Sequence, residues 1–466
     1  MCRTKPLNLR YPSTHTGCDS PTREIIQRML AALIVFMVWQ GDGRLLAQSA
    51  RPSTTPGQRR VEARSAAASD SNNQPSGEAV YGNVFDDAAY GEDGGWNRCG
   101  DGSELCCPWW QLPPGNLEVR GEYLLWWGKG DHVPALVTTS PAGTPRTAAG
   151  VLGGNTSILF GDADLNKEAR SGVRVTLDYW LGSGYTTAIE ASYVGLGSQT
   201  ETYQAQSAGT PILARPYYNV STNQQDSGLI AFPGVQTGSV NVIDSTDFQS
   251  TEILLRYNWV RQCGARLDFL AGYRHMQLND DLQIDESGIS TDPQSVVPVG
   301  TRLDLSDRFQ TLNQFNGVDL GVLAQWHRCQ WSLDLLLKMA LGSTSSRVTI
   351  DGVTHITAPD QAPATYSGAF LAQQTNIGQY ERNTFTVIPE IGATVGYDLT
   401  SQVRLTAGYN LLYWSTVARP GAQINTKLNS TQFPPETLVG APQPQFQFAT
   451  SGFWAQGLNL GLDFRF

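Results

Sequence analysis

The chain ends in Leu458-Asn-Leu-Gly-Leu-Asp-Phe-Arg-Phe466, a stretch in which every second side chain is apolar. Successive side chains of a β-strand point to opposite faces, so the leucines and phenylalanines share one face and Asn459, Gly461, Asp463 and Arg465 share the other. The first face suits lipid and the second suits water. The last strand of a soluble β-sandwich has the same alternation, so this stretch alone does not decide between the two.

Nine further segments repeat the alternation and keep their charged side chains on one face. They are residues 117–127, 173–181, 189–193, 253–259, 267–273, 318–326, 331–341, 385–399 and 403–413. With the terminal strand they make ten. Tyrosines and tryptophans gather near the strand ends on the apolar face, as they do at the interfaces of a membrane barrel. These are Trp127, Tyr179, Tyr193, Trp259, Tyr273, Trp326, Tyr397, Tyr413 and Trp454.

The connections between these segments alternate strictly between short and long. The short ones are residues 182–184, 260–265, 327–330 and 400–402, and the long ones are 128–171, 196–250, 279–317, 342–384 and 415–453. Short turns at one end and long loops at the other are typical of transmembrane β-barrels. We therefore expect an all-β fold, an antiparallel transmembrane barrel of about ten strands, within a range of eight to twelve, with short periplasmic turns and long extracellular loops.

Two details could change this strand count. Residues 342–382, which include Arg347-Val-Thr-Ile-Asp351, are long enough to hold another hairpin and would raise the count to twelve. Pro389 lies inside a predicted strand, and because proline has no backbone N–H it predicts a bulge or a break in register there.

The amino-terminal part of the chain has a different composition. Residues 29–39 (MLAALIVFMVW) form an apolar run that follows Arg23 and Arg28 and is too short to span a bilayer as a helix. We expect residues 1–47 to be a secretory signal peptide, 48–115 a low-complexity periplasmic segment and 116–466 the barrel. The net charge of -10 excludes nucleic acid as a partner, because phosphate binding needs clustered lysine and arginine.

Several motifs, in the same order, resemble a planctomycete outer-membrane family, the beta-barrel porin family seven. They are Glu122-Tyr-Leu-Leu-Trp-Trp-Gly-Lys129, Pro134-Ala-Leu-Val-Thr-Thr-Ser-Pro141, Gly150-Val-Leu-Gly153, Leu159-Phe-Gly161, Arg170-Ser-Gly172, Ile388-Pro-Glu390, Val417-Ala-Arg-Pro-Gly421 and Phe453-Trp-Ala-Gln-Gly457. The resemblance covers roughly residues 117–466 and implies an outer-membrane barrel more firmly than it implies transport. A last strand that ends in Phe466 also resembles the signal that the barrel assembly machinery recognises.

The polar face of the strands would line the lumen of such a barrel. It carries Glu118, Glu122, Asp178, Glu190, Glu252, Asp268, Asp319, Asp334, Glu390, Asp398 and Asp463, against Arg120, Arg174, Arg256, Arg274, Lys338, Arg404 and Arg465. A barrel of this strand number is little wider than its own side chains need, so we expect a salt-bridged plug in preference to an open channel. If the lumen conducts, its acid excess favours cations.

Other chemistry finds little support in the sequence. Asp131-His132 suggests a barrel hydrolase, yet no serine, histidine and acid set can be assembled, and His132 is better explained as a loop residue. Asn279-Asp-Asp281 with Asp285 and Glu286 lacks the glycine and spacing of a calcium loop, so we interpret it as a solvated acidic loop. We expect no catalytic, cofactor-binding or metal-binding residues and no cofactor.

Seven cysteines are present, and Cys2 and Cys18 would leave with the signal peptide. Cys99, Cys106 and Cys107 precede the strands with a spacing that does not match a zinc site. A disulfide between Cys263 and Cys329, which lie in short turns, competes with pairing to one of the other three.

The sequence therefore predicts an outer-membrane β-barrel that is not an enzyme and that acts as a narrow pore or as a structural envelope protein, with outer-membrane lipid as its surroundings. The alternative is a secreted soluble β-sandwich that binds a partner.

Overall fold

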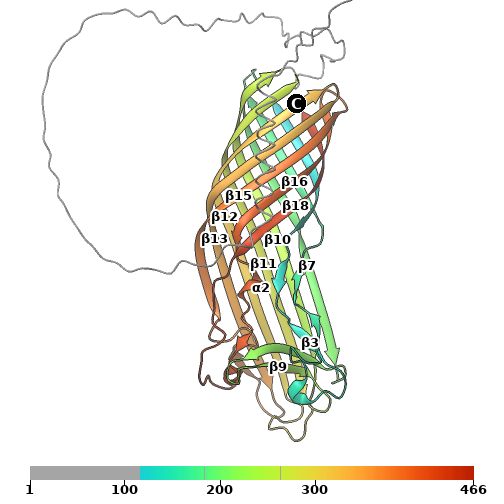
Figure 1. The fold of residues 1–466 in the computed structure, drawn as a ribbon, viewed down its shortest axis with the longest axis vertical. Coiled ribbons are helices and arrows are strands. Elements are labelled where there is room, and N and C mark those ends of the chain that lie inside the picture. Colours follow the sequence, from blue (N-terminus) through green and yellow to red (C-terminus); the bar gives the residue numbers. More distant parts are fainter. Residues whose placement is uncertain (1–115, 183, 263) are drawn as a thin grey trace, which may run out of the picture. The chain divides into compact units, whose positions relative to one another are not determined.

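The computed structural model describes residues 116–182, 184–262 and 264–466. Ten antiparallel strands form a ring, in the order β12-β11-β10-β7-β6-β1-β18-β16-β15-β13, and pairing of β12 with β13 closes it (Figure 1). The strands are β1 (Leu117–Gly128), β6 (Arg170–Leu181), β7 (Thr187–Ser207), β10 (Gln236–Gln262), β11 (Ala265–Ser290), β12 (Arg302–Arg328), β13 (Trp331–Thr357), β15 (Gly378–Asp398), β16 (Val403–Val417) and β18 (Ser451–Arg465). Each of the ten predicted segments lies in one of them, apart from Leu399 and Phe466, which lie one residue past the ends of β15 and β18, so the fold class is confirmed.

The terminal strand closes the ring against the first one. Val119 pairs with Phe464 and Leu125 with Leu458, without a register shift along β1 and β18. The last residue also takes part, because the backbone N–H of Phe466 donates to the carbonyl of Leu117 at 2.8 Å. Closure leaves no unpaired edge at this end of the sheet, which is what a lipid environment requires of a β structure.

The outer face of the ring is apolar over the part that adjoins the short turns, called here the short-turn end. Exposed side chains there include Val173, Tyr179, Leu255, Tyr257, Trp259, Leu320, Trp331, Leu405, Leu460 and Phe464. In a soluble sandwich these residues would face a core. Their exposure around a closed ring matches a lipid-facing band, and the predicted aromatic residues Tyr179, Tyr193, Trp259 and Tyr273 lie on it.

The opposite end, called here the long-loop end, differs from the prediction. Residues 279–317 were expected to be one long loop, but β11 continues to Ser290 and β12 begins at Arg302. In the same way β10 begins at Gln236 and β13 runs to Thr357. The end of β13 and β14 (Ala364–Ser367) do form a short extra hairpin, as predicted, but β14 does not enter the ring, which keeps ten strands and not twelve. The outer faces of these extensions are polar. Their sequences therefore lack the alternation of apolar and polar side chains by which the other strands were predicted.

Beyond the apolar band the ring opens into a sheet. The pairing of β6 with β7 ends at Gly172 and Leu196, and that of β15 with β16 ends at Glu390 and Leu412. Strands β7, β10, β11, β12, β13 and β15 continue past these points as the extended sheet. At its far edge β14 (Ala364–Ser367) pairs with β13.

The long loops cover the inner face of the extended sheet (Figure 1). They contain β2 (Asp131–Val133), β3 (Val137–Thr139), β4 (Ser157–Phe160), β5 (Ala163–Leu165), β8 (Leu213–Asn219), β9 (Gln224–Ala231), α2 (Pro420–Gln423) and β17 (Lys427–Leu428), with short 3-10 turns at Arg146–Ala148 and Ser430–Gln432. Strands β17, β8, β3, β4 and β9 form a small second sheet. Their apolar side chains pack with Val242, Ile284 and Ile350 of the extended sheet into one cluster, called here the loop core.

Pro389 has the predicted effect on one side of its strand only. The ladder of β15 with β13 passes Pro389 without a shift, whereas the ladder with β16 stops at Glu390, the next residue. Because proline cannot donate a ladder hydrogen bond, this is the natural place for the ring to open. No helix among the described residues is long and apolar enough to cross a membrane.

Candidate functional site

The lumen is the candidate site, and ion pairs fill its part nearest the short turns. All the charged residues predicted to line it lie inside, and each except Glu190 has an opposite charge within 3.9 Å. At the short-turn end Arg120 Nε lies 2.5 Å from Asp463 Oδ1, and Arg404 Nη2 lies 2.7 Å from Asp334 Oδ2. The prediction of paired charges across the lumen is confirmed.

A second group of charges, called here the charged cluster, lies deeper. It consists of Glu122, Arg174, Glu252, Arg274, Asp319, Lys338 and Glu390. Arg274 is fully buried and contacts Glu252 at 2.5 Å, Asp319 at 2.9 Å and also Glu390. A cavity of about 70 Å³ remains between this cluster and the short-turn pairs, lined in part by Glu190.

An apolar layer lies beyond the charged cluster and was not predicted. It contains Leu124, Trp126, Val194, Leu196, Phe248, Met276, Leu278, Phe315, Ala340, Ile388, Leu412, Trp414, Val417, Phe453 and Ala455, all buried. The two tryptophans keep their indole N–H groups satisfied: Trp126 donates to Asn459 at 2.7 Å and Trp414 to Thr344 at 2.9 Å. Such a layer excludes water and ions from the middle of the lumen.

The sequence does contain a signal for this layer. On β1 the inward positions are Glu118, Arg120 and Glu122 and then change to Leu124 and Trp126, while the outward positions stay apolar throughout. Several strands show the same change of their inward residues at the same level. This change of the inward residues is missed when only the outward residues are followed, because beyond it both faces of the strand are apolar.

Above the apolar layer a small set of buried charges, called here the loop-end cluster, ties the loops to the strands. It consists of Asp131, Arg170, Asp244, Asp280 and Arg419. Arg419 Nε lies 3.0 Å from Asp280 Oδ2, and Asp131 accepts a hydrogen bond from the backbone of Gly421 in α2 at 2.7 Å. Burial raises the pKa of Asp131 to about 6, with a further increase from Asp280, while Arg419 opposes the shift.

The residues considered for catalysis or metal binding do not come together in a site. His132 is exposed on β2, where its Nδ1 lies 3.0 Å from Asp164 Oδ1 of the paired strand β5, in keeping with a loop residue. Within the described ranges no three or more histidine, cysteine, aspartate or glutamate side chains are arranged to hold a metal ion.

The acidic stretch at residues 279–286 is not a loop, and this expectation was wrong. It belongs to β11, so its side chains alternate between the two faces. Asp281 faces outward and pairs with Arg308, whereas Glu286 faces inward, 3.6 Å from Arg215.

The cysteine predictions are largely outside the described residues. Cys329 lies in the turn between β12 and β13 with a φ of 55°. Cys99, Cys106, Cys107 and Cys263 are outside the described ranges, so the disulfide between turns remains a prediction.

The model of one family, described as Putative beta barrel porin-7 (BBP7), matches residues 119–466. The chain belongs to this family. The match confirms the resemblance seen in the sequence motifs, though not the planctomycete origin. With the exposed apolar band around a closed ring, it identifies the chain as an outer-membrane β-barrel protein, surrounded by the lipid of that membrane.

Solved structures offer only distant likenesses, and no curated protein sequence matches the chain. The outer membrane protease OmpT from Escherichia coli shares 10% identity, with 76% of this chain and 98% of that one covered and a TM-score of 0.35. A deletion mutant of the TodX monoaromatic hydrocarbon channel shares 7% identity over 78% and 93% of the two chains, with a TM-score of 0.21. A Pseudomonas aeruginosa FadL homologue shares 7% over 75% and 90%, with a TM-score of 0.20. Likenesses this weak say nothing about activity.

Proposed function

We propose that the protein is a closed outer-membrane barrel with a structural role in the cell envelope, and that it is not an open diffusion pore or an enzyme. The apolar layer is the observation on which this rests. Trp126, Trp414, Phe315 and Phe453 are each 1% exposed or less inside the ring, between two sets of buried ion pairs. An ion on this path would leave water for an apolar environment, which costs many kcal/mol without a partner.

The loop core adds a second barrier. Phe309, Val348 and Ile350 of the extended sheet pack against Leu213 and Ile230 of the loops, all at 1% exposure or less. Apolar packing of this extent is the ordinary interior of a folded domain and does not resemble a mobile lid over a channel.

A narrow gated pore is the second candidate. The family name and the cavity of about 70 Å³ beside the charged cluster favour it. If it opens, acids exceed bases in the charged cluster by four to three, so the current would favour cations.

Planar-bilayer recording with the full-length purified protein separates these two functions. A closed structural barrel gives no conductance steps at high protein concentration and at voltages of either sign. Reproducible cation-selective steps, absent from a mock purification, would overturn the structural proposal and establish the pore.

The amino-terminal organisation belongs to the same proposal. Residues 1–47 act as the signal peptide and 48–115 as a periplasmic segment ahead of the barrel, and the barrel assembly machinery recognises the last strand through Phe466. The apolar run at 29–39 with its preceding arginines supports export. The intact mass of the protein recovered from outer membranes tests it, because retention of residues 1–47 would contradict cleavage.

A further inference from the structure

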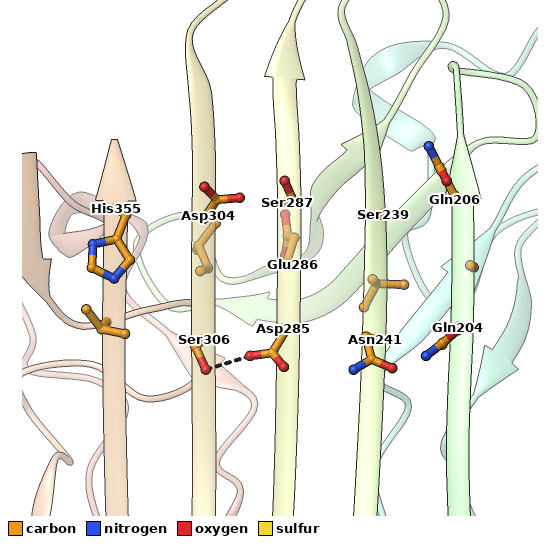
Figure 2. A pocket seen from close by; sticks show the side chains of 14 residues that line it. Gln204, Gln206, Ser239, Asn241, Asp285, Glu286, Ser287, Asp304, Ser306 and His355 are labelled. Atoms are coloured by element: carbon orange, nitrogen blue, oxygen red, sulfur yellow. Dashed lines mark hydrogen bonds between the residues drawn. The ribbon is translucent and has the colours of Figure 1, made fainter. Parts of the chain in front are cut away.

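A hollow of about 560 Å³ lies on the outer face of the extended sheet, formed by β7, β10, β11, β12 and β13 (Figure 2). On β10 and β11 the side chains of Val240, Val242 and Ile284 face the loop core. Their alternating neighbours, among them Asn241 and Asp285, therefore face outward into the hollow. Its volume lies within the range of sites for small molecules, about 300–1,000 Å³.

The hollow is well removed from the lipid-facing band. The last exposed large apolar residue on the outer face of β11 within that band is Tyr273, and Asp285 lies twelve positions further along the strand. At roughly 3.3 Å per residue this is a path of about 40 Å. The hollow is thus on the part of the strand that adjoins the long loops, away from the lipid-facing band.

The polar side chains of the hollow form two rows that run across the strands. The register pairs Gln204 with Asn241, Asn241 with Asp285 and Asp285 with Ser306 in the first row. In the second row it pairs Gln206 with Ser239, Ser239 with Ser287, Ser287 with Asp304 and Asp304 with His355. Neighbouring strands are about 4.8 Å apart, so a polar group recurs at that interval across the sheet.

Most of these groups have hydrogen-bonding capacity to spare. Within the described ranges no side-chain hydrogen bond involves Gln204, Gln206, Ser239 or Ser287, and the carboxamide oxygen of Asn241 is buried without a partner. A buried acceptor without a hydrogen-bond partner is destabilising. A ligand hydroxyl that donates to Asn241, after a small turn of the carboxamide, would supply the missing hydrogen bond.

The charges exclude other ligand classes. The two nearby arginines are already paired, Arg302 with Asp304 at 2.8 Å and Arg308 with Asp281, so neither offers an anion an unpaired guanidinium group. Asp285 accepts from Ser306 at 2.7 Å and from Gln283 at 3.0 Å, which reduces its attraction for a free cation. Amides, hydroxyls and a hydrogen-bonded carboxylate in a regular row match the hydroxyl groups of an uncharged sugar chain.

We propose that this hollow binds an extended neutral oligosaccharide lying across the five strands, with successive sugar rings over successive strands. Gln204 and Asn241 donate and accept hydrogen bonds with adjacent hydroxyls, and Asp285, which has no cationic partner within ion-pair distance among the described residues, repels acidic sugars. The proposal adds a ligand to the structural role and does not depend on whether the lumen is closed.

The test uses the full-length protein in detergent micelles, with binding measured by calorimetry and by saturation-transfer NMR. The probes are the neutral hexasaccharides maltohexaose, cellohexaose, mannohexaose and hexa-N-acetylchitohexaose, with acidic hexagalacturonate and cationic spermine for comparison. We expect at least one neutral hexasaccharide to bind, and to bind tighter than its disaccharide because it reaches more strands. The polysaccharide extracted from the host's own surface competes if the ligand comes from the same cell and does not compete if it comes from outside.

A matched pair of variants locates the site. Gln204→Ala with Asn241→Ala removes one cross-strand amide pair in the hollow, and Gln249→Ala with Gln277→Ala removes an equivalent outward pair of β10 and β11 nearer the membrane. We expect the first to weaken binding tenfold or more and the second to leave it unchanged, with heat-modifiable mobility confirming that both fold. Absence of binding by every neutral probe, tighter binding of hexagalacturonate or spermine, or equal effects of the two double variants would each overturn the proposal.

Discussion

The ammonium nitrogen of Lys338 on β13 lies 2.6 Å from the carboxylate Oε2 of Glu252 on β10, a strand three places away around the ring. The pair therefore spans part of the lumen and joins two strands that are not neighbours in the sheet. Both side chains are about 5% exposed, so removing one leaves the other charge buried without this partner. The charged cluster acts as an internal crosslink as well as a barrier.

Replacing Lys338 with methionine should destabilise the barrel strongly. The change leaves Glu252 and Glu390 with one cation fewer, and removing one partner of a buried pair typically costs about 3–5 kcal/mol. Urea unfolding in lipid vesicles measures the loss. Arg347→Met is the control, because the Arg347–Glu381 pair is about half exposed and an exposed ion pair contributes little to stability. Equal losses in the two variants would contradict the role given to Lys338.

Truncating Trp414 to alanine should destabilise the barrel without opening it. The side chain is fully buried and its ring lies 6.3 Å from that of Phe315, so the cavity created should cost about 3–5 kcal/mol. The charged cluster and the loop core still block the lumen, so bilayer recordings should show no conductance. Steps in this variant alone would mean that the apolar layer is the sole seal.

The membrane-spanning half of the fold was predictable because lipid imposes a strict rule on it. Outward residues that meet lipid must be apolar. Segments such as 173–181 and 403–413 can therefore be recognised as strands from the periodicity of a single sequence. The extended sheet follows no such rule. Its outward residues, Asn241 and Asp285 among them, meet water, and its inward residues meet a core made by loops distant in sequence.

The candidate site was predictable in part, as the fold was. Inward charges such as Arg274 and Glu390 were identified from parity alone, and a narrow ring forces them together. Their particular partners depend on strand stagger and tilt, which periodicity does not contain. The apolar layer was missed because Trp126 and Trp414 look like ordinary strand residues until the inward face is followed separately.

Stability should depend on pH through Asp131. Its pKa is about 6 in the folded protein against an ordinary value of 3.8, because burial disfavours the charged form. As the pH rises, Asp131 ionises in the unfolded chain before it ionises in the folded protein. The free energy of unfolding is therefore highest below about pH 4, decreases between about pH 4 and pH 6, and is lower by ~3 kcal/mol above that range.

Asp131→Asn should remove that fall while keeping an acceptor for the N–H of Gly421. The groups around Asp131 also include Arg419, Asp280, Asp244 and His132, so the useful quantity is the difference between the unfolding midpoints of the two proteins across pH 4 to 7. A difference that does not change with pH would show that Asp131 keeps an ordinary pKa.

Removing Phe466 should impair insertion into the outer membrane much more than it impairs the folding of any single loop. The residue is 61% exposed and outward-facing, so its side chain adds little packing, yet its backbone joins the first strand through Leu117. Phe466→Ala keeps those backbone bonds and isolates the side chain, and Phe464→Ala is the matched control two residues away on the same face. We expect the heat-modifiable barrel recovered from outer membranes to fall severalfold for the deletion and for Phe466→Ala, and little for Phe464→Ala. Wild-type amounts of inserted barrel in both Phe466 variants would mean that the assembly machinery recognises some other part of the last strand.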